Sequence, residues 1–391
     1  MKLKNRWGNL AAGFILLLFM GLIYAWSIIG APISADLGWS SSQNSLVFTI
    51  SMIFFCLGGI AAGLSAKRIP LKVMLWIAAA CMLIGFFIAA HAKNHIEVCL
   101  TYGVLCGTGV GISYNSVISS VSKWFPDRPG FCSGTLLMGF GAGGMLLGNF
   151  ASALETALGW RSTFVIFAVT YAAILVAASL LFGIPAMSIV VSKDEDDASM
   201  GITQILRTQS FWLCFVWAVA LSGAGLAVIA QAQQIAVGIQ IAVQRATLLV
   251  GAISVCNGLS RVVVGSAFDT LGMKKVMMAI SALFLVAIGG ICVASKLGNA
   301  VLLTICFLLI GFAYGGCPPV CASFVMAMYG KKYYALNFSA MNTNLIAASL
   351  LGPIIVSKSV DTTGSYLTGF YILLGLVVCV APLPLLISRK K

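Results

Sequence analysis

The chain has 391 residues, of which 60% are hydrophobic and only 8% are charged, with a formal net charge of +13. Soluble globular proteins carry about 25% charged residues, so this composition excludes a soluble enzyme, a disordered regulator and a nucleic-acid-binding domain. Nucleic acid is excluded despite the positive charge, because the basic residues are dispersed between apolar runs and form no basic face. We therefore expect a polytopic α-helical membrane protein with short loops.

Twelve apolar runs are long enough to cross a bilayer as helices, which takes about 20 residues each. They cover residues 8–30, 43–65, 72–91, 96–120, 130–152, 161–184, 210–232, 245–266, 275–295, 300–321, 336–357 and 364–387. The stretch 185–209 is the only long polar connection, with an acidic run at 194–197. The sequence thus predicts an all-α fold of two six-helix bundles, 1–184 and 210–391, joined by a cytoplasmic linker at 185–209.

The distribution of basic residues predicts the orientation, because cytoplasmic loops carry an excess of Lys and Arg. With both termini inside, the inner loops and tails hold Lys2, Lys4, Arg6, Lys67, Arg68, Lys72, Lys123, Arg128, Lys193, Arg207, Lys274, Lys275, Lys331, Lys332, Arg389, Lys390 and Lys391. The outer loops hold only Lys93, Arg161, Arg245, Lys296 and Lys358. We therefore expect a multi-pass protein of the cytoplasmic (inner) membrane with both termini in the cytoplasm.

The 12 cysteines lie within or at the ends of apolar runs. They form no Cys-x-x-Cys pair and no metal-ligand spacing with His91 or His95, the two histidines of the chain. We interpret them as small buried apolar residues. No metal ion and no cofactor is expected.

A short motif repeats at about half the chain length. Residues 265–275 read Gly-Ser-Ala-Phe-Asp-Thr-Leu-Gly-Met-Lys-Lys, and residues 63–72 read Gly-Leu-Ser-Ala-Lys-Arg-Ile-Pro-Leu-Lys. Glycine allows two helices to approach closely, an aspartate can cap or pair at a helix end, and the lysines keep the loop inside. The motif residues are Gly63, Gly265, Asp269, Gly272, Lys274 and Lys275. The plain alternative is a basic loop between two helices.

This motif resembles the loop motif of the major facilitator superfamily, and the resemblance extends to twelve spans, a central linker and a half-chain repeat. It implies a transporter with two pseudo-symmetric bundles and a binding site at the midplane between them. The N-terminal copy departs from the family pattern at Lys67, where Asp is usual, and at Pro70, where Gly is usual. These departures weaken the expectation that this copy acts as a conformational lock.

Within the superfamily, the chain resembles the oxalate/formate antiporter family and the related monocarboxylate transporters. The matching strings are Tyr-Ala-Trp-Ser-Ile-Ile-Gly-Ala-Pro at 24–32, Leu-Gly-Trp-Ser at 37–40, Lys-Trp-Phe-Pro-Asp-Arg at 123–128, Gly-Trp-Arg-Ser-Thr-Phe at 159–164 and Asn-Gly-Leu-Ser-Arg at 257–261. Each string is weak alone. Their order and their positions on the predicted spans make them specific together.

Arg261 is the charged residue that lies deepest in an apolar run. It precedes Asp269 by eight residues, which places it roughly 12 Å inside the helix end and near the midplane of a core about 30 Å thick. An unpaired arginine at that depth costs at least ~2.5–3.5 kcal/mol. Two interpretations compete: neighbouring carbonyls and hydroxyls satisfy Arg261, or an anionic substrate does.

The acidic residues favour the substrate. All of them are expected in loops or at span ends: Asp36, Glu97, Asp127, Glu155, Asp269, Asp361 and the acids of the linker. A substrate carboxylate is then the natural partner, because arginine binds carboxylates with a planar, bidentate fork. The family resemblance likewise implies that the arginine of span 8 binds substrate.

The rest of the expected site rests on the resemblance. Tyr24 and Tyr114 match tyrosines that line the family's cavity, and Phe140 stands where a tyrosine is often found. Further wall residues are expected at Trp26, Asn115 and Tyr314, and Arg128 belongs to the expected structural motif. The alternative for any single aromatic residue is ordinary helix packing.

Two departures from the family shape the functional prediction. Oxalate carriers have a second cation, a lysine, at about the position of Asn344, so a single arginine favours a monocarboxylate over a dianion. Asn342 and Asn344 are expected to hydrogen-bond a hydroxyl or carbonyl of the substrate. Proton-coupled relatives have an aspartate where this chain has Asn257, which cannot titrate but shares a helix face with Arg261. The sequence therefore favours anion exchange, or electrogenic uniport with a slow return of the empty carrier.

The alternatives are a proton-linked monocarboxylate symporter and a carrier of larger amphipathic carboxylates or drugs. A channel or a membrane sensor fits less well, and an enzyme is excluded because no catalytic pair or nucleotide loop is present. The expected partners are a small carboxylate and the lipid bilayer, with no nucleic acid, and we expect a monomer.

Overall fold

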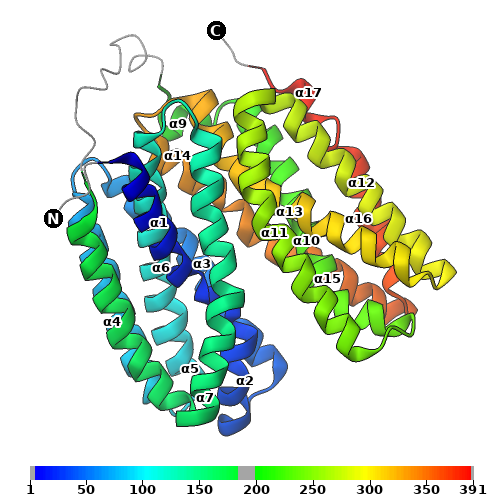
Figure 1. The fold of residues 1–391 in the computed structure, drawn as a ribbon, viewed down its shortest axis with the longest axis horizontal. Coiled ribbons are helices and arrows are strands. Elements are labelled where there is room, and N and C mark those ends of the chain that lie inside the picture. Colours follow the sequence, from blue (N-terminus) through cyan, green and yellow to red (C-terminus); the bar gives the residue numbers. More distant parts are fainter. Residues whose placement is uncertain (1–4, 184–198, 389–391) are drawn as a thin grey trace. The chain divides into compact units, whose positions relative to one another are not determined.

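The computed structural model describes residues 5–183 and 199–388 (Figure 1). Over these ranges the chain is helical and contains no strand. The part of the predicted linker at 185–198 lies outside the described residues. Its described end includes the short helix α9 (Ile202–Ile205).

The chain divides into two compact units. Unit 1 comprises Met1–Asp127, Thr135–Met200 and Tyr329–Ala340, and unit 2 comprises Arg128–Gly134, Gly201–Met328 and Met341–Lys391. Each unit therefore includes a short segment that lies in the other predicted bundle. The bundle boundaries predicted at 184 and 210 stay a prediction.

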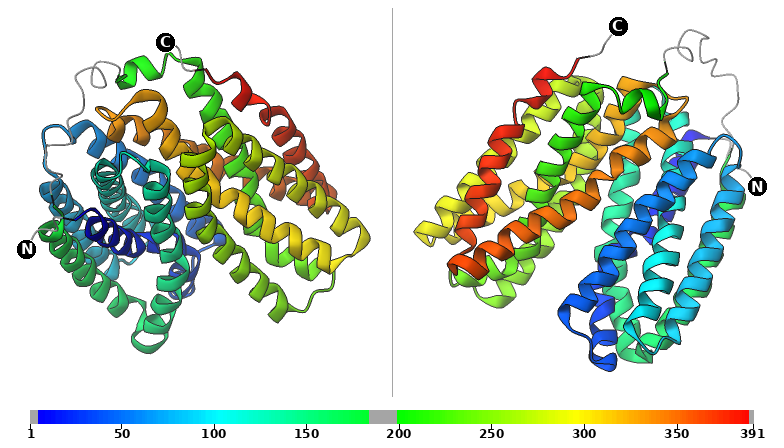
Figure 2. Two further views of the ribbon diagram at one scale, coloured as in Figure 1. Left: turned by 45° about the horizontal axis from the view of Figure 1, so that its top comes forward. Right: turned by 180° about the vertical axis from the view of Figure 1, so that it is seen from behind.

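Unit 1 is built from helices that run alongside one another (Figure 2). They are α1 (Arg6–Met20), η1 (Gly21–Ala25), α2 (Trp26–Leu37), α3 (Ser41–Ser65), α4 (Leu71–Ala90), α5 (His95–Val98), the π-helix η2 (Cys99–Cys106), α6 (Gly107–Val121), η3 (Ser122–Trp124) and most of α7 (Pro129–Leu181). Local sequence sets several boundaries. The Ser40 side chain accepts a hydrogen bond from the backbone N–H of Gln43, and the Gln43 side-chain oxygen accepts one from the backbone N–H of Ser40, so α3 begins with a capping box.

Unit 2 contains the remaining long helices. They are α10 (Gln209–Gly238), α11 (Val243–Leu271), α12 (Met273–Leu297), α13 (Ala300–Tyr329), α15 (Asn344–Thr363), α16 (Tyr366–Val380) and α17 (Leu383–Leu386), while α14 (Tyr334–Asn342) begins in unit 1. Gly272 separates α11 from α12 with a φ of 84°, a conformation that glycine adopts without steric cost.

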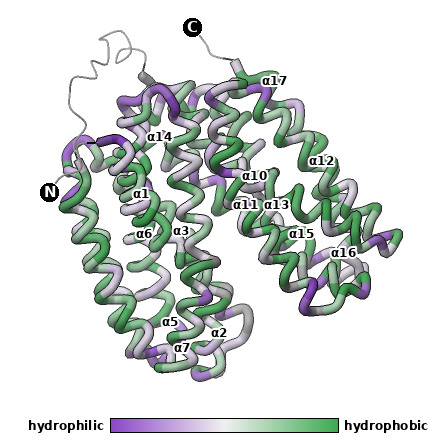
Figure 3. The backbone as a smooth tube through the Cα atoms, viewed as in Figure 1, coloured by the Kyte–Doolittle hydropathy of each residue, from purple (hydrophilic) through white to green (hydrophobic). Residues whose placement is uncertain are grey.

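Eleven stretches of the described residues are long and apolar enough to cross a membrane. One of them, α7, has 53 residues and covers the predicted spans 130–152 and 161–184. The stretch consists of two helical segments separated by a non-helical residue, Gly159, with φ 78° and ψ 158°, in agreement with the two predicted spans. In both units hydrophilic residues gather toward helix ends (Figure 3). Several helices extend past the predicted spans, because helical hydrogen bonding continues into the polar ends.

Glycines bring α1 and α7 into backbone contact in unit 1. A Cβ added at Gly143 would overlap the carbonyl oxygen of Leu18, and one added at Gly21 would overlap that of Phe140. Small residues at helix crossings let two backbones approach this closely, which strengthens packing where lipid gives no hydrophobic driving force.

We expect Gly143→Ala to lower the thermal unfolding temperature of the purified protein by several degrees. The added methyl group forces α1 and α7 apart, and overpacking of this kind costs about 1–3 kcal/mol. The matched control is Gly375→Ala on α16, where an added Cβ meets no atom within 4 Å. The control is expected to match or slightly exceed the wild type, because alanine favours helix over glycine. Equal unfolding temperatures for the two variants would contradict the close approach.

Candidate functional site

Arg261 lies in α11 of unit 2 and is almost completely buried, with 5% of its surface exposed. Its guanidinium Nη2 donates a hydrogen bond to Oδ1 of Asn257 at 3.3 Å, one helical turn earlier. This pair is the geometry expected from an i, i+4 spacing. Asn257 thus orients the guanidinium. Because its amide is neutral, this hydrogen bond does not cancel the charge of Arg261.

The backbone of α11 at Arg261 meets the beginning of α7, whose residues 128–134 also belong to unit 2. A Cβ at Gly134 would overlap the carbonyl oxygen of Arg261, so only glycine permits this distance. One helical turn away, Gly130 and Gly265 are in similar contact. These glycines therefore let α11 pack directly against α7 at the level of Arg261.

Asp269 caps the amino end of α7. Its two carboxylate oxygens accept hydrogen bonds from the backbone N–H groups of Gly130 and Phe131, each at 2.8 Å. A carboxylate at a helix amino end satisfies free N–H groups and interacts favourably with the helix dipole. In the C-terminal motif copy, Gly265 and Asp269 thus act together at one helix end.

The other motif residues fall at several places. In the N-terminal copy, a Cβ at Gly63 would press on the backbone of Leu336, and Lys67 lies over the ring of Tyr333 at 3.7 Å from its centroid, all within unit 1. A cation–π contact therefore takes the place of the usual aspartate in this copy. In the C-terminal copy, Lys274 donates to the carbonyl of Leu385 at 3.2 Å. Lys275 and Arg128 are exposed.

An aromatic cluster in unit 1 brings together three of the predicted site residues. The ring of Phe140 lies 5.2 Å from that of Tyr24 and 4.8 Å from that of Tyr114. Phe55 packs on both Tyr114 and Phe140, and Phe338 stacks on Tyr114. Tyr24 belongs to the 3₁₀ segment η1, between α1 and α2.

Trp26 lies apart from this cluster. Its indole Nε1 donates to the carbonyl of Asn44 at 2.9 Å, and its ring lies 4.3 Å from that of Tyr102. Asn115 is likewise engaged within unit 1, where its amide donates to the carbonyl of Ala335 at 3.0 Å and to the hydroxyl of Ser339 at 2.5 Å.

The remaining predicted residues belong to unit 2. Tyr314 on α13 is mostly buried and packs against Gly225 of α10, where an added Cβ would lie 2.7 Å from the tyrosine Cβ. Asn344 begins α15, and its amide donates to the carbonyl of Met341 at 2.5 Å. Asn342 is buried beside it. The structure therefore groups the cation and the asparagines in one unit and the aromatic cluster in the other.

Sequence reasoning missed the burial of one acid. Glu155 was expected at a span end, and it lies one helical turn before the break at Gly159, but only 7% of its surface is exposed. Neither carboxyl oxygen has a hydrogen-bond partner among the described residues. A signal was present in the sequence: Gly148 and Ala151, seven and four residues earlier, put small residues on the same helix face, which indicates a face packed against another helix.

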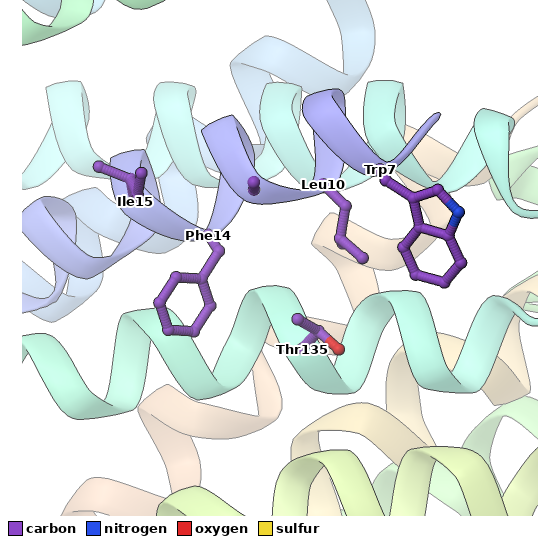
Figure 4. A pocket seen from close by; sticks show the side chains of 6 residues that line it. Trp7, Leu10, Phe14, Ile15 and Thr135 are labelled. Atoms are coloured by element: carbon purple, nitrogen blue, oxygen red, sulfur yellow. The ribbon is translucent and has the colours of Figure 1, made fainter. Parts of the chain in front are cut away.

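A groove of about 410 Å³ lies along α1 and α7 in unit 1 (Figure 4). Its lining residues are Trp7, Leu10, Ala11, Phe14, Ile15 and Thr135. The lining contains no charged side chain, so it offers nothing to bind a carboxylate.

The comparison with protein families decides the identity. Residues 11–353 match the model of the Major Facilitator Superfamily, which is far more than half of the chain. The chain belongs to the major facilitator superfamily. Members of this superfamily are membrane transporters, so the protein is a multi-pass membrane protein and a transporter, not an enzyme.

Individual relatives agree with the superfamily. The chain is 26% identical over 340 residues to the uncharacterized MFS-type transporter YhjX of Escherichia coli, with 86% of this chain and 84% of the relative covered. It is 23% identical over 357 residues to the oxalate:formate antiporter of Oxalobacter formigenes, with 90% and 84% covered. The resemblance inferred from the sequence motifs is confirmed.

The predicted fold class is confirmed as well. The crystal structure of the E. coli fucose:proton symporter FucP superimposes with a TM-score of 0.71 over 98% of this chain and all of that chain, at 15% sequence identity. At this identity the likeness concerns the fold alone.

We expect Asp269→Asn to lower the unfolding temperature by a few degrees. The substitution removes the negative charge at the amino end of α7 and leaves one acceptor where two are needed, a loss of about 1–2 kcal/mol. The control is Asp127→Asn, which removes an exposed ion pair with Arg6 at 3.1 Å. Exposed pairs contribute about 0–1 kcal/mol, so this variant is expected to stay near wild type. A larger effect of the control would contradict the assigned role of Asp269.

Proposed function

We propose that this transporter moves small organic anions, specifically monocarboxylates, across the cytoplasmic membrane by alternating access. The supporting observation is Arg261, a buried guanidinium in an apolar helix that donates a hydrogen bond to the neutral amide of Asn257. A carboxylate that enters beside Arg261 brings the opposite charge and two acceptors in the geometry of the guanidinium fork. The protein acts as a monomer with both termini in the cytoplasm.

The substrate carries one negative charge. Arg261 neutralises one carboxylate, and the position at which oxalate carriers have a second cation is occupied by the neutral Asn344. A second carboxylate would remain buried without a counter-charge, which is costly. The name of the oxalate:formate antiporter supports carboxylate transport by a relative, and the missing cation argues for the monoanion in this chain.

The binding test is a thermal-shift screen of formate, lactate, pyruvate and oxalate on purified protein. We expect the monocarboxylates to raise the unfolding temperature of the wild type and to have no such effect on Arg261→Ala or Arg261→Gln. A hydrogen-bonded charge pair contributes about 1.5–3 kcal/mol, so affinity falls by at least about tenfold. The control Arg161→Ala removes a half-exposed arginine that pairs with Asp36, and it keeps ligand binding.

Three outcomes would contradict the proposal. Undiminished binding to both Arg261 variants would show that the site lies elsewhere. Stabilisation by larger amphipathic acids with none by the four small acids would favour the alternative substrate class, because a bulky acid also suits one arginine and aromatic walls. Stabilisation by oxalate above that by formate would contradict the single-charge argument.

Exchange is the proposed transport mode. Asn257 cannot take a proton, and an empty site keeps the positive charge of Arg261, so the empty carrier closes poorly whereas the loaded carrier is neutral at this point. Proteoliposomes loaded with formate are therefore expected to take up labelled formate much faster than empty ones. Protein-free liposomes correct for passive entry of formic acid. Equally rapid uptake into empty vesicles under a pH gradient would instead support the proton-linked symporter.

A further inference from the structure

Glu155 is a buried ionisable side chain, like Arg261, but the proposed anion site does not use it. It lies in α7 within unit 1 and has 7% of its surface exposed. Both carboxyl oxygens are inaccessible to solvent, and neither has a hydrogen-bond partner among the described residues. Buried polar groups are normally paired, so this carboxyl requires an explanation.

The face of α7 that carries Glu155 packs against η1 and the beginning of α2. A Cβ at Gly144 would lie 3.0 Å from the Cβ of Tyr24, and one at Gly148 would lie 2.9 Å from the Cβ of Ala25. Ala151 is fully buried on the same face, and Glu155 follows it by four residues. Water is therefore excluded from this face by closely packed helices.

The cation in this region is already engaged. Arg161, six residues after Glu155, pairs with Asp36 at the end of α2 through an N–O distance of 2.6 Å. The indole of Trp160 donates to the same carboxylate at 3.1 Å. These two hydrogen bonds, that from Arg161 first, hold the pKa of Asp36 below its usual range. Asp36 thus stays ionised and keeps Arg161.

The other helices that contact α7 in unit 1 offer no counter-charge at this end. Against the first half of α7 the titratable residues are Tyr24 in η1, Cys56 on α3 and Tyr114 on α6, none of which is a cation. Against the second half, the titratable side chains of η2 are only Cys and Tyr, and Lys72 of α4 lies over Trp76, which bonds to Ser179 at the far end of α7. Arg6 on α1 lies at the opposite end of the helices, paired with Asp127. An ionised Glu155 would therefore be a buried anion for which the described residues provide no cation and no hydrogen-bond donor.

We propose that Glu155 is a proton-binding site. A buried carboxylate without a partner is far more costly than the neutral acid, so the conformation described here binds a proton at Glu155. A conformation in which the faces of α2 and α7 separate hydrates the carboxyl and releases the proton. Proton occupancy of Glu155 is thereby linked to whether this end of unit 1 is closed.

The consequence for transport rests on the proposed function. In anion exchange, the proton that Glu155 releases on opening is bound again from the same side on closing, so no net proton moves, but the exchange rate depends on pH. In the symport alternative, the empty carrier returns without a proton on Glu155. Glu155 is then the group that couples proton movement to transport.

The decisive test needs no substrate: the unfolding temperature is measured against pH for wild type, Glu155→Gln and Glu97→Gln. Glu155→Gln keeps the shape of the acid but never ionises. At about pH 5 its unfolding temperature is expected to equal that of the wild type, and from there to about pH 8 the wild type loses several degrees relative to it. The unfolding temperature of the wild type falls as the pH rises because ionisation of the buried Glu155 destabilises only the closed, folded state.

Glu97 provides the matched control. It is half-buried and already accepts hydrogen bonds from the backbone of Lys93 at 2.7 Å and from the side chain of Asn94 at 2.6 Å. Glu97→Gln is therefore expected to run parallel to the wild type across the pH range. Parallel profiles for the wild type and Glu155→Gln would overturn the proposal, whatever the outcome of the carboxylate screen.

A labelling experiment covers the case in which Glu155→Gln does not fold. The apolar reagent dicyclohexylcarbodiimide adds to protonated carboxyl groups in apolar surroundings, and peptide mass spectrometry locates the adduct. In the wild type, Glu155 is expected to be labelled more at about pH 6 than at about pH 8, with Glu97 unlabelled at both. Absence of the adduct at Glu155 at the lower pH would contradict the proposal.

Discussion

The burial of one guanidinium is the constraint on which the arrangement of unit 2 depends. Arg261 is 5% exposed, and a cation in that position must be compensated for the fold to persist. Asn257 fixes the direction of the guanidinium without cancelling its charge. Gly134 then lets α7 approach the backbone of α11 at the same height. Had Asn257 been an aspartate, the pair would be internally neutral and an anion would have less to gain from binding.

The long helix α7 connects features that the two units hold separately. Its first residues belong to unit 2, where Asp269 caps them, and its middle belongs to unit 1, where Phe140 joins the aromatic cluster. Near the break at Gly159 it carries Glu155. The helical backbone is continuous from Pro129 to the break at Gly159, so the segment capped by Asp269 and the segment that carries Phe140 and Glu155 belong to one helix.

Much of the fold was predictable, because a bilayer leaves few choices. Apolar runs of spanning length located the helices, and Arg261 stood out as a charge inside such a run. The hydrogen bond to Asn257 followed from the i, i+4 spacing alone. These features are local, and local sequence determines them.

What the sequence did not predict depends on contacts between helices. The apolar pattern located the break between two spans near Gly159, but not that a single positive-φ glycine forms it. Trp26 was expected as a wall residue of the site, whereas its ring lies on Tyr102. Hydropathy located Glu155 at a span end but did not predict its burial, because hydropathy records position along the chain and not which face another helix covers.

Arg261 and Glu155 place matching requirements on a carrier that must close to move. Under the two proposals, an anion neutralises Arg261 in unit 2 and a proton neutralises Glu155 in unit 1. The two requirements are independent, since each concerns residues of one unit. A carrier with both sites filled would be neutral at both, and such a carrier would exchange one anion for another at low cost. A carrier that loses only the anion keeps a buried cation, and one that loses only the proton keeps a buried anion. The preference for exchange is therefore strongest where the proton remains bound, and pH sets how strictly it holds.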